Sequence, residues 1–143
     1  MKHETLLPGM KETIKAFAVD LLGCGCSGEV FDSIEVSNED FGRVFRGGRR
    51  ILIGRRLLIY IVPWSDRVAV PDDIDRLIHR GKEERDRNGY NRFRLALAAD
   101  RADEVREQNG DLLQSLVRGD EKLHVHILPA DNPLVSSIVR QEI

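Results

Sequence analysis

The chain has 143 residues, of which 41% are hydrophobic and 32% are charged, and its formal net charge at pH 7 is −2. This length suits one core, and we expect a single domain over residues 1–143. The nearly balanced charge gives no global field of the kind that marks nucleic-acid-binding or membrane-binding proteins. No apolar run is long enough to span a bilayer, and the N-terminus lacks the apolar stretch of a signal peptide. The sequence therefore predicts a cytoplasmic protein with no membrane partner.

The first predicted element is a helix over residues 10–22. Apolar side chains recur there at the three- and four-residue spacing of a buried helix face, and Gly23 stands where a left-handed residue commonly ends a helix. Two short elements are predicted next, a helical turn over residues 27–32 and a strand over residues 33–36.

A β-hairpin is predicted in residues 41–62, with one arm over residues 49–53, the other over residues 57–62, and Gly54 between them. The second arm is apolar at every position, which is typical of a central strand that is covered on both faces. Pro63 is expected to end this strand, because proline has no amide hydrogen to donate to a neighbouring strand.

Helices and strands alternate in the rest of the chain. A helix begins at Pro71, and its apolar pattern fades after Gly81 into a charged run that ends at Asn88. The remaining predicted elements are a strand over residues 93–99, a helix over residues 102–116 that is interrupted or bent at Asn109–Gly110, a strand over residues 123–127 and a short helix within residues 131–143.

The strand–helix–strand stretch over residues 91–128 is a candidate βαβ unit, whose two strands would run parallel. Together with the preceding hairpin it predicts an α/β or α+β fold, in which helices pack on the faces of a mixed sheet of four to five strands.

Two pairs of metal-ligating residues are the most informative feature of the sequence. Cys24 and Cys26 are the only cysteines, and His124 and His126 are two of the four histidines. Each pair has one-residue spacing, and the histidines alternate with apolar residues, so on a strand both would face away from the core. Two thiolates and two imidazoles would together form a tetrahedral zinc site or hold an iron–sulfur cluster.

The thiols alone offer a second chemistry. The thiolate is the reactive form of cysteine, and we expect Cys26 to be the more acidic thiol because it precedes a helical turn. A disulfide between Cys24 and Cys26 closes a very small ring, so it would be strained and easily reduced, as suits thiol exchange. The plain alternative is that both cysteines are small buried apolar residues and that His124 and His126 are only half-exposed.

Six arginines and no acidic residue fall within residues 43–56. Guanidinium groups match the geometry of phosphate, so an anion-binding surface is one interpretation of these arginines. The other is that they are the solvated ends of a hairpin and also protect an edge strand from pairing. The four candidate anion-binding residues on the two arms and the turn are Arg49, Arg50, Arg55 and Arg56.

The patterns leave three hypotheses open, and they do not decide whether the protein is an enzyme. The preferred one is an accessory protein that binds a metal or cycles its redox state through the Cys-Gly-Cys motif. The second is a non-enzymatic module in which the hairpin over residues 43–56 binds phosphate or nucleic acid, with nucleic acid not favoured. The third is a homodimeric interaction protein, and a homodimer is compatible with all three because most soluble homo-oligomers have two-fold symmetry.

Overall fold

The computed structural model describes residues 10–23, 31–41, 45, 47–64 and 71–140. Five strands form one mixed sheet, whose spatial order follows the chain from β1 to β5. The strands are β1 (Ile34–Asn38), β2 (Arg49–Ile53), β3 (Leu57–Trp64), β4 (Arg92–Ala99) and β5 (Leu123–Pro129). The helices are α1 (Met10–Ala16), which continues into the π-helical turn η1 (Phe17–Leu21), α2 (Pro71–Asn88), α3 (Ala102–Val117) and α4 (Pro133–Arg140).

The strand directions confirm the predicted α/β fold with a mixed sheet. The pairs β1–β2 and β2–β3 are antiparallel, whereas β3–β4 and β4–β5 are parallel. The predicted hairpin is β2–β3, and Gly54 takes a φ of +59° in its turn, which glycine adopts without a steric penalty. The predicted βαβ unit is β4–α3–β5, and its strands are parallel as expected.

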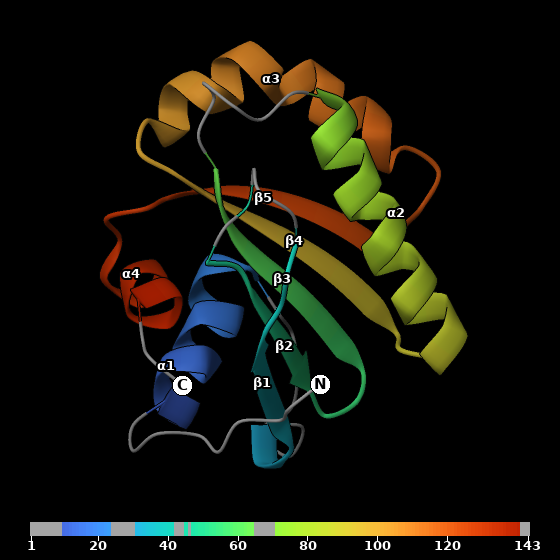
Figure 1. Ribbon diagram of the computed structural model, residues 1–143, viewed down its shortest axis with the longest axis vertical. Helices are drawn as coiled ribbons and strands as arrows, with labels where there is room; N and C mark the ends of the chain where they lie inside the picture. Colours follow the sequence, from blue (N-terminus) through green and yellow to red (C-terminus); the bar gives the residue numbers. More distant parts are fainter. Residues whose placement is uncertain (1–9, 24–30, 42–44, 46, 65–70, 141–143) are drawn as a thin grey trace.

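Helices cover both faces of the sheet (Figure 1). Helices α2 and α3 pack on one face, and α1 and α4 lie side by side on the other. Because successive side chains of a strand point to opposite faces, β3 contributes Leu58, Tyr60 and Val62 to the first core and Ile59 and Ile61 to the second. The prediction that this strand is central and covered on both faces is therefore confirmed.

Three details differ from the sequence-based expectation. Helix α3 passes Asn109–Gly110 without interruption. Strand β3 continues through Pro63 to Trp64. A second βαβ unit, β3–α2–β4, was not predicted, although its helix and both of its strands were.

The charged half of α2 is explained by its position over the sheet. Gly81 lies against Phe93, and a Cβ atom built on this glycine would collide with the Phe93 ring. The helix therefore approaches β4 closely at this point while its charged side chains reach water and the rim of the sheet. None of the helices in the described part of the chain combines the length and apolar composition needed to cross a membrane.

Candidate functional site

The two histidines lie where the sequence predicted them, on β5 and on the face opposite its apolar residues. Leu123 and Ile127 pack into the core under α2 and α3, so the alternation of a strand directs His124 and His126 to the side of α1 and α4. The ring centroids of the two histidines are 6.4 Å apart. Cys24 and Cys26, their proposed partners, lie outside the described residues.

Each histidine contacts an arginine of the neighbouring strand β4. Nη1 of Arg94 lies 3.0 Å from Nε2 of His126, and Nη1 of Arg92 lies 3.4 Å from Nε2 of His124. A guanidinium group only donates hydrogen bonds, so the imidazole Nε2 atoms accept and the proton of each neutral ring is on Nδ1. The Nε2 lone pairs of both histidines are therefore directed at cations.

Burial and the adjacent arginines keep these histidines neutral. Burial is the main cause that lowers the pKa of His126 to about 4, the positive charge of Arg94 adds to it, and His124 adds to it only in its protonated form. The pKa of His124 is also lowered, first by burial and then by the charges of Arg94 and Arg92. The cluster of these four side chains, Arg92, Arg94, His124 and His126, is called the cationic cluster below.

Arg94 is the central residue of the cationic cluster. It is 9% exposed, and Nη1 donates a 2.8 Å hydrogen bond to the main-chain oxygen of Leu22 as well as contacting His126. Within the described part of the chain, its Nε has no hydrogen-bond partner and no carboxylate pairs with its charge. Burial, followed by the charge of Arg92, lowers the pKa of Arg94. Arg94 is thus a buried cation whose described partners are all uncharged.

The bond to Leu22 connects the cationic cluster to the chain segment that leads into the cysteines. Leu22 is buried, Gly23 follows it with a φ of +71°, and Cys24 is the next residue. Arg94 therefore binds the described segment that directly precedes the Cys-Gly-Cys motif in the sequence.

The charge of the cationic cluster favours an anion over a metal cation. A divalent ion next to Arg92 and Arg94 would be repelled, whereas a thiolate or an oxyanion would be stabilised. Among the described residues, no group of three or more His, Cys, Asp or Glu side chains is arranged to hold a metal. The zinc or iron–sulfur hypothesis depends on Cys24 and Cys26, which lie outside the described residues.

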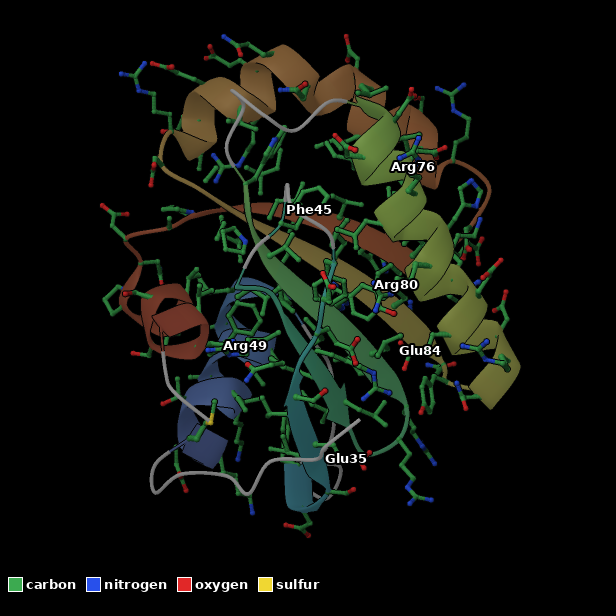
Figure 2. All side chains as sticks on the ribbon, viewed as in Figure 1. Glu35, Phe45, Arg49, Arg76, Arg80 and Glu84 are labelled. Carbon is green, nitrogen blue, oxygen red and sulfur yellow. The ribbon has the colours of Figure 1, made fainter. Side chains whose placement is uncertain are left out.

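The four arginines of the hairpin do not share one surface. Arg49 and Arg50 are both buried and point to opposite faces of β2. Nη2 of Arg49 donates to the main-chain oxygen of Val139 at 3.1 Å on the side of α1 and α4, and Figure 2 shows it away from Arg80 and Glu84 of α2. Arg55 and Arg56 are exposed in the turn between the strands.

Arg50 instead pairs with the helix on its own face. Its Nε donates a 2.6 Å hydrogen bond to Oε2 of Glu84, and Oε1 of the same carboxylate accepts a 2.5 Å hydrogen bond from the Tyr60 hydroxyl. This network lies across the sheet from the cationic cluster.

Sequence reasoning missed Arg92, Arg94 and Glu84. Arg94 stands inside the apolar run of β4, between Phe93 and Leu95. A charged residue at an interior strand position needs polar partners, so the position of Arg94 in this apolar run could have indicated a polar site. Glu84 gave no such signal, because it lies in a run of charged residues on α2.

No family model, curated protein or solved structure matches the chain. Function is therefore inferred from the chemistry of these side chains.

Proposed function

We propose that the protein is a thiol-redox accessory protein in which Cys24 and Cys26 exchange between dithiol and disulfide beside the cationic cluster. The single observation that supports this function is the position of Arg94. Its Nη1 atom lies 2.8 Å from the main-chain oxygen of Leu22 and 3.0 Å from Nε2 of His126. Leu22 stands two residues before Cys24 in the sequence.

The electrostatic argument concerns the charge of Arg94. A buried guanidinium group without a paired anion is costly, because its desolvation is not offset by a Coulomb attraction. A thiolate of Cys24 or Cys26 would offset that cost, and a nearby arginine lowers a thiol pKa and so raises the reactive fraction at neutral pH. His126 acts as a neutral acceptor that holds the guanidinium of Arg94 in place.

The reaction is an exchange with a disulfide of a second molecule. One thiolate attacks a sulfur of that disulfide and releases one thiol, and the other cysteine then displaces the second thiol. The two cysteines lose two electrons and two protons in total, and the partner disulfide gains both as two thiols. The small ring of a Cys-Gly-Cys disulfide makes the reverse reaction easy, which suits a carrier of reducing equivalents.

A redox titration in glutathione buffers tests this function. The reduced protein is equilibrated at a series of glutathione ratios, trapped with an alkylating agent and analysed by peptide mass spectrometry. We expect a reversible Cys24–Cys26 disulfide with a reduction potential less negative than about −300 mV, the value below which structural disulfides resist glutathione. The Cys24→Ser variant is the control, and it should form only mixed disulfides. Thiols that stay reduced or pair only between molecules at every ratio would reject the function.

Metal binding by the same cysteines is the other form of the preferred hypothesis. Cys24, Cys26, His124 and His126 would supply the four ligands of zinc or of an iron–sulfur cluster. The arginines directed at both Nε2 atoms favour thiol exchange over this arrangement. Elemental analysis of anaerobically purified protein separates the two, since stoichiometric zinc or iron that is lost in the double cysteine-to-serine variant would support the metal site.

The cytoplasm is the compartment that suits such a dithiol, because glutathione and thioredoxin keep thiols reduced there.

A homodimer and nucleic-acid binding by the hairpin stay as predictions. Light scattering tests the first. A titration of labelled nucleic acid at rising salt tests the second, with Arg55 and Arg56 as the residues to substitute because Arg49 and Arg50 are buried.

A further inference from the structure

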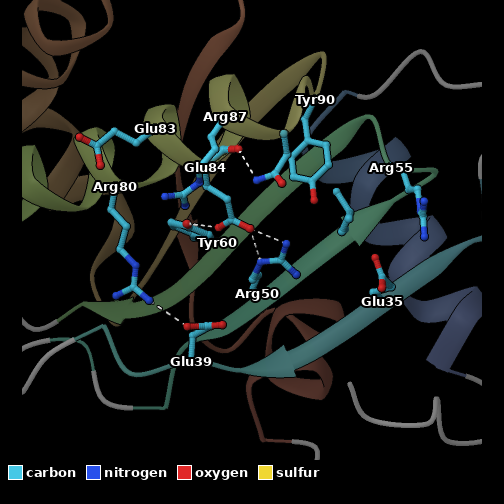
Figure 3. Close-up of a pocket in the computed structure, with 12 residues that line it drawn as sticks. Glu35, Glu39, Arg50, Arg55, Tyr60, Arg80, Glu83, Glu84, Arg87 and Tyr90 are labelled. Carbon is cyan, nitrogen blue, oxygen red and sulfur yellow. Dashed lines mark hydrogen bonds and ion pairs between the residues drawn. The ribbon is translucent and has the colours of Figure 1, made fainter. Parts of the chain in front are cut away.

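A polar groove lies on the other face of the sheet, between the rim formed by β1 and β2 and the second half of α2 (Figure 3). Its volume is about 690 Å³, which is within the usual range of roughly 300–1,000 Å³ for small-molecule sites. Figure 3 shows Arg50 in the middle of the groove, with Arg55 and Tyr90 toward one end and Arg80 and Glu39 toward the other.

The floor of the groove is a fixed hydrogen-bond network. The Tyr60 hydroxyl and the Nε atom of Arg50 donate to different oxygens of Glu84, at 2.5 Å and 2.6 Å. Burial and then the bond to Glu84 raise the pKa of Tyr60, so its hydroxyl stays protonated and remains a donor. Tyr60 is 1% exposed, and its ring packs between Phe41 and Phe93 in the core. The core therefore holds this polar network in position.

Arg50 has donor capacity that the network does not use. The residue is 7% exposed, and among the described residues its Nη1 atom has no hydrogen-bond partner. A buried N–H group without an acceptor carries a desolvation cost of about 1–3 kcal/mol. An acceptor oxygen of a ligand would remove that cost.

The two ends of the groove differ in how their arginines are engaged. At one end Arg80 donates to Glu39 at 2.8 Å and to the main-chain oxygen of Asp40 at 2.8 Å, and it lies over the Phe41 ring at 4.8 Å. At the other end Arg55 forms no ion pair with any described residue, and Tyr90 adds a phenol hydroxyl. The Glu35 carboxylate lines the groove at this same end, so the positive charge of Arg55 lies beside one negative charge.

We propose that this groove binds a small ligand through an oxyanion group, a carboxylate or a phosphate. The oxyanion accepts the unused N–H groups of Arg50, and Arg55 and Tyr90 approach it from the open end. Because Glu84 already neutralises Arg50, the site recognises a small ligand by directed hydrogen bonds and not by a large positive field. The groove and the cationic cluster lie on opposite faces of the sheet.

A nuclear magnetic resonance titration tests the proposal. The ¹⁵N-labelled full chain is titrated with inorganic phosphate and separately with acetate, and sodium chloride keeps the ionic strength constant. We expect saturable shifts of the Arg50 side chain and of the amides of Arg55 and Tyr90. Tighter binding of phosphate identifies a phosphorylated ligand, and tighter binding of acetate identifies a carboxylate ligand.

Two matched variants make the titration decisive. Arg55 has a φ of +55°, a conformation that asparagine tolerates, so Arg55→Asn removes the charge without straining the turn. It should weaken binding about threefold, the effect of one solvent-screened charge. Arg101→Asn removes another exposed arginine, at the start of α3, and should change nothing. Shifts that do not saturate, or equal weakening by both variants, would overturn the proposal.

Discussion

The sheet buries three arginines, Arg49, Arg50 and Arg94, whose hydrogen-bond partners differ. Arg50 pairs with the carboxylate of Glu84. Arg49 donates to the main-chain oxygen of Val139, and Arg94 donates to that of Leu22 while contacting His126. Among the described residues, Arg94 pairs with no carboxylate and has two histidines and a second arginine around it. The charge of Arg94 is therefore the one that most requires an anion.

His126 makes stability depend on pH. Its pKa is lowered from 6.5 to about 4 in the folded state, so between these pH values His126 is protonated in the unfolded chain and neutral in the folded chain. The free energy of unfolding should therefore fall as the pH drops from about 6.5 toward 4, by up to about 3 kcal/mol. Urea denaturation across this range measures it. The His126→Gln variant keeps a hydrogen-bond acceptor for Arg94 but has no group that titrates in this range. If its stability depends on pH as steeply as that of the unmodified protein, His126 is not the cause of the pH dependence.

Tyr60 and Tyr90 offer a matched pair of hydroxyl deletions. Tyr60→Phe removes a buried hydrogen bond to the Glu84 carboxylate and should lower the free energy of unfolding by about 1.5–3 kcal/mol. Tyr90→Phe removes a partly exposed hydroxyl and should change it by less than about 0.5 kcal/mol. Equal losses in chemical denaturation would show that the Tyr60–Glu84 bond does not contribute to stability.

At the scale of the elements, two helical glycines should respond oppositely to alanine. Gly81 of α2 lies against Phe93, so Gly81→Ala overpacks the interface and should cost about 1–3 kcal/mol despite the better helix propensity of alanine. A Cβ atom on Gly110 of α3 would meet nothing within 4 Å, so Gly110→Ala should gain about 0.5–1 kcal/mol. Thermal unfolding of the two variants measures both changes. Stabilisation by Gly81→Ala would contradict the close approach of α2 to β4.

Local patterns were enough to predict most of the fold. Strand β5 was predicted because a strand that is buried on one face alternates apolar and polar residues. Strand β3 was predicted because a strand that is buried on both faces is apolar at every position. The end of helix α2 at Asn88 was also predicted, because Asn88–Gly89 interrupts a helical pattern. The reason for a glycine at position 81 could not be predicted, since it is a contact with Phe93 on another element.

The candidate site was predicted only in part. The direction of His124 and His126 follows from the strand period, and their position on β5 confirms it. Their contacts with Arg92 and Arg94 depend on the pairing of β4 with β5, which joins residues about 30 positions apart. No local pattern carries that information, so the positive charge around the histidines could not be foreseen.

At the scale of the whole molecule, the described elements share one sheet with helices on both faces, and we predict a single cooperative unfolding transition. Trp64, the only tryptophan, is 7% exposed in the core under α2 and α3 and reports on packing there. Its fluorescence and the far-ultraviolet circular dichroism should give coincident curves in urea. Two separate transitions would contradict a single domain.

The acidity of the cysteine thiols tests the central claim most directly. The rate of alkylation of Cys24 and Cys26 by iodoacetamide is measured against pH, residue by residue, in the unmodified protein and in Arg94→Gln. Arg49→Gln is the matched control, because it also removes a buried arginine that donates to a main-chain oxygen. We predict that at least one thiol has a pKa below the ordinary value of about 8.5, and that Arg94→Gln alone returns it toward that value. Thiols with an ordinary pKa in the unmodified protein, or a pKa that Arg94→Gln does not change, would contradict the thiol-redox function.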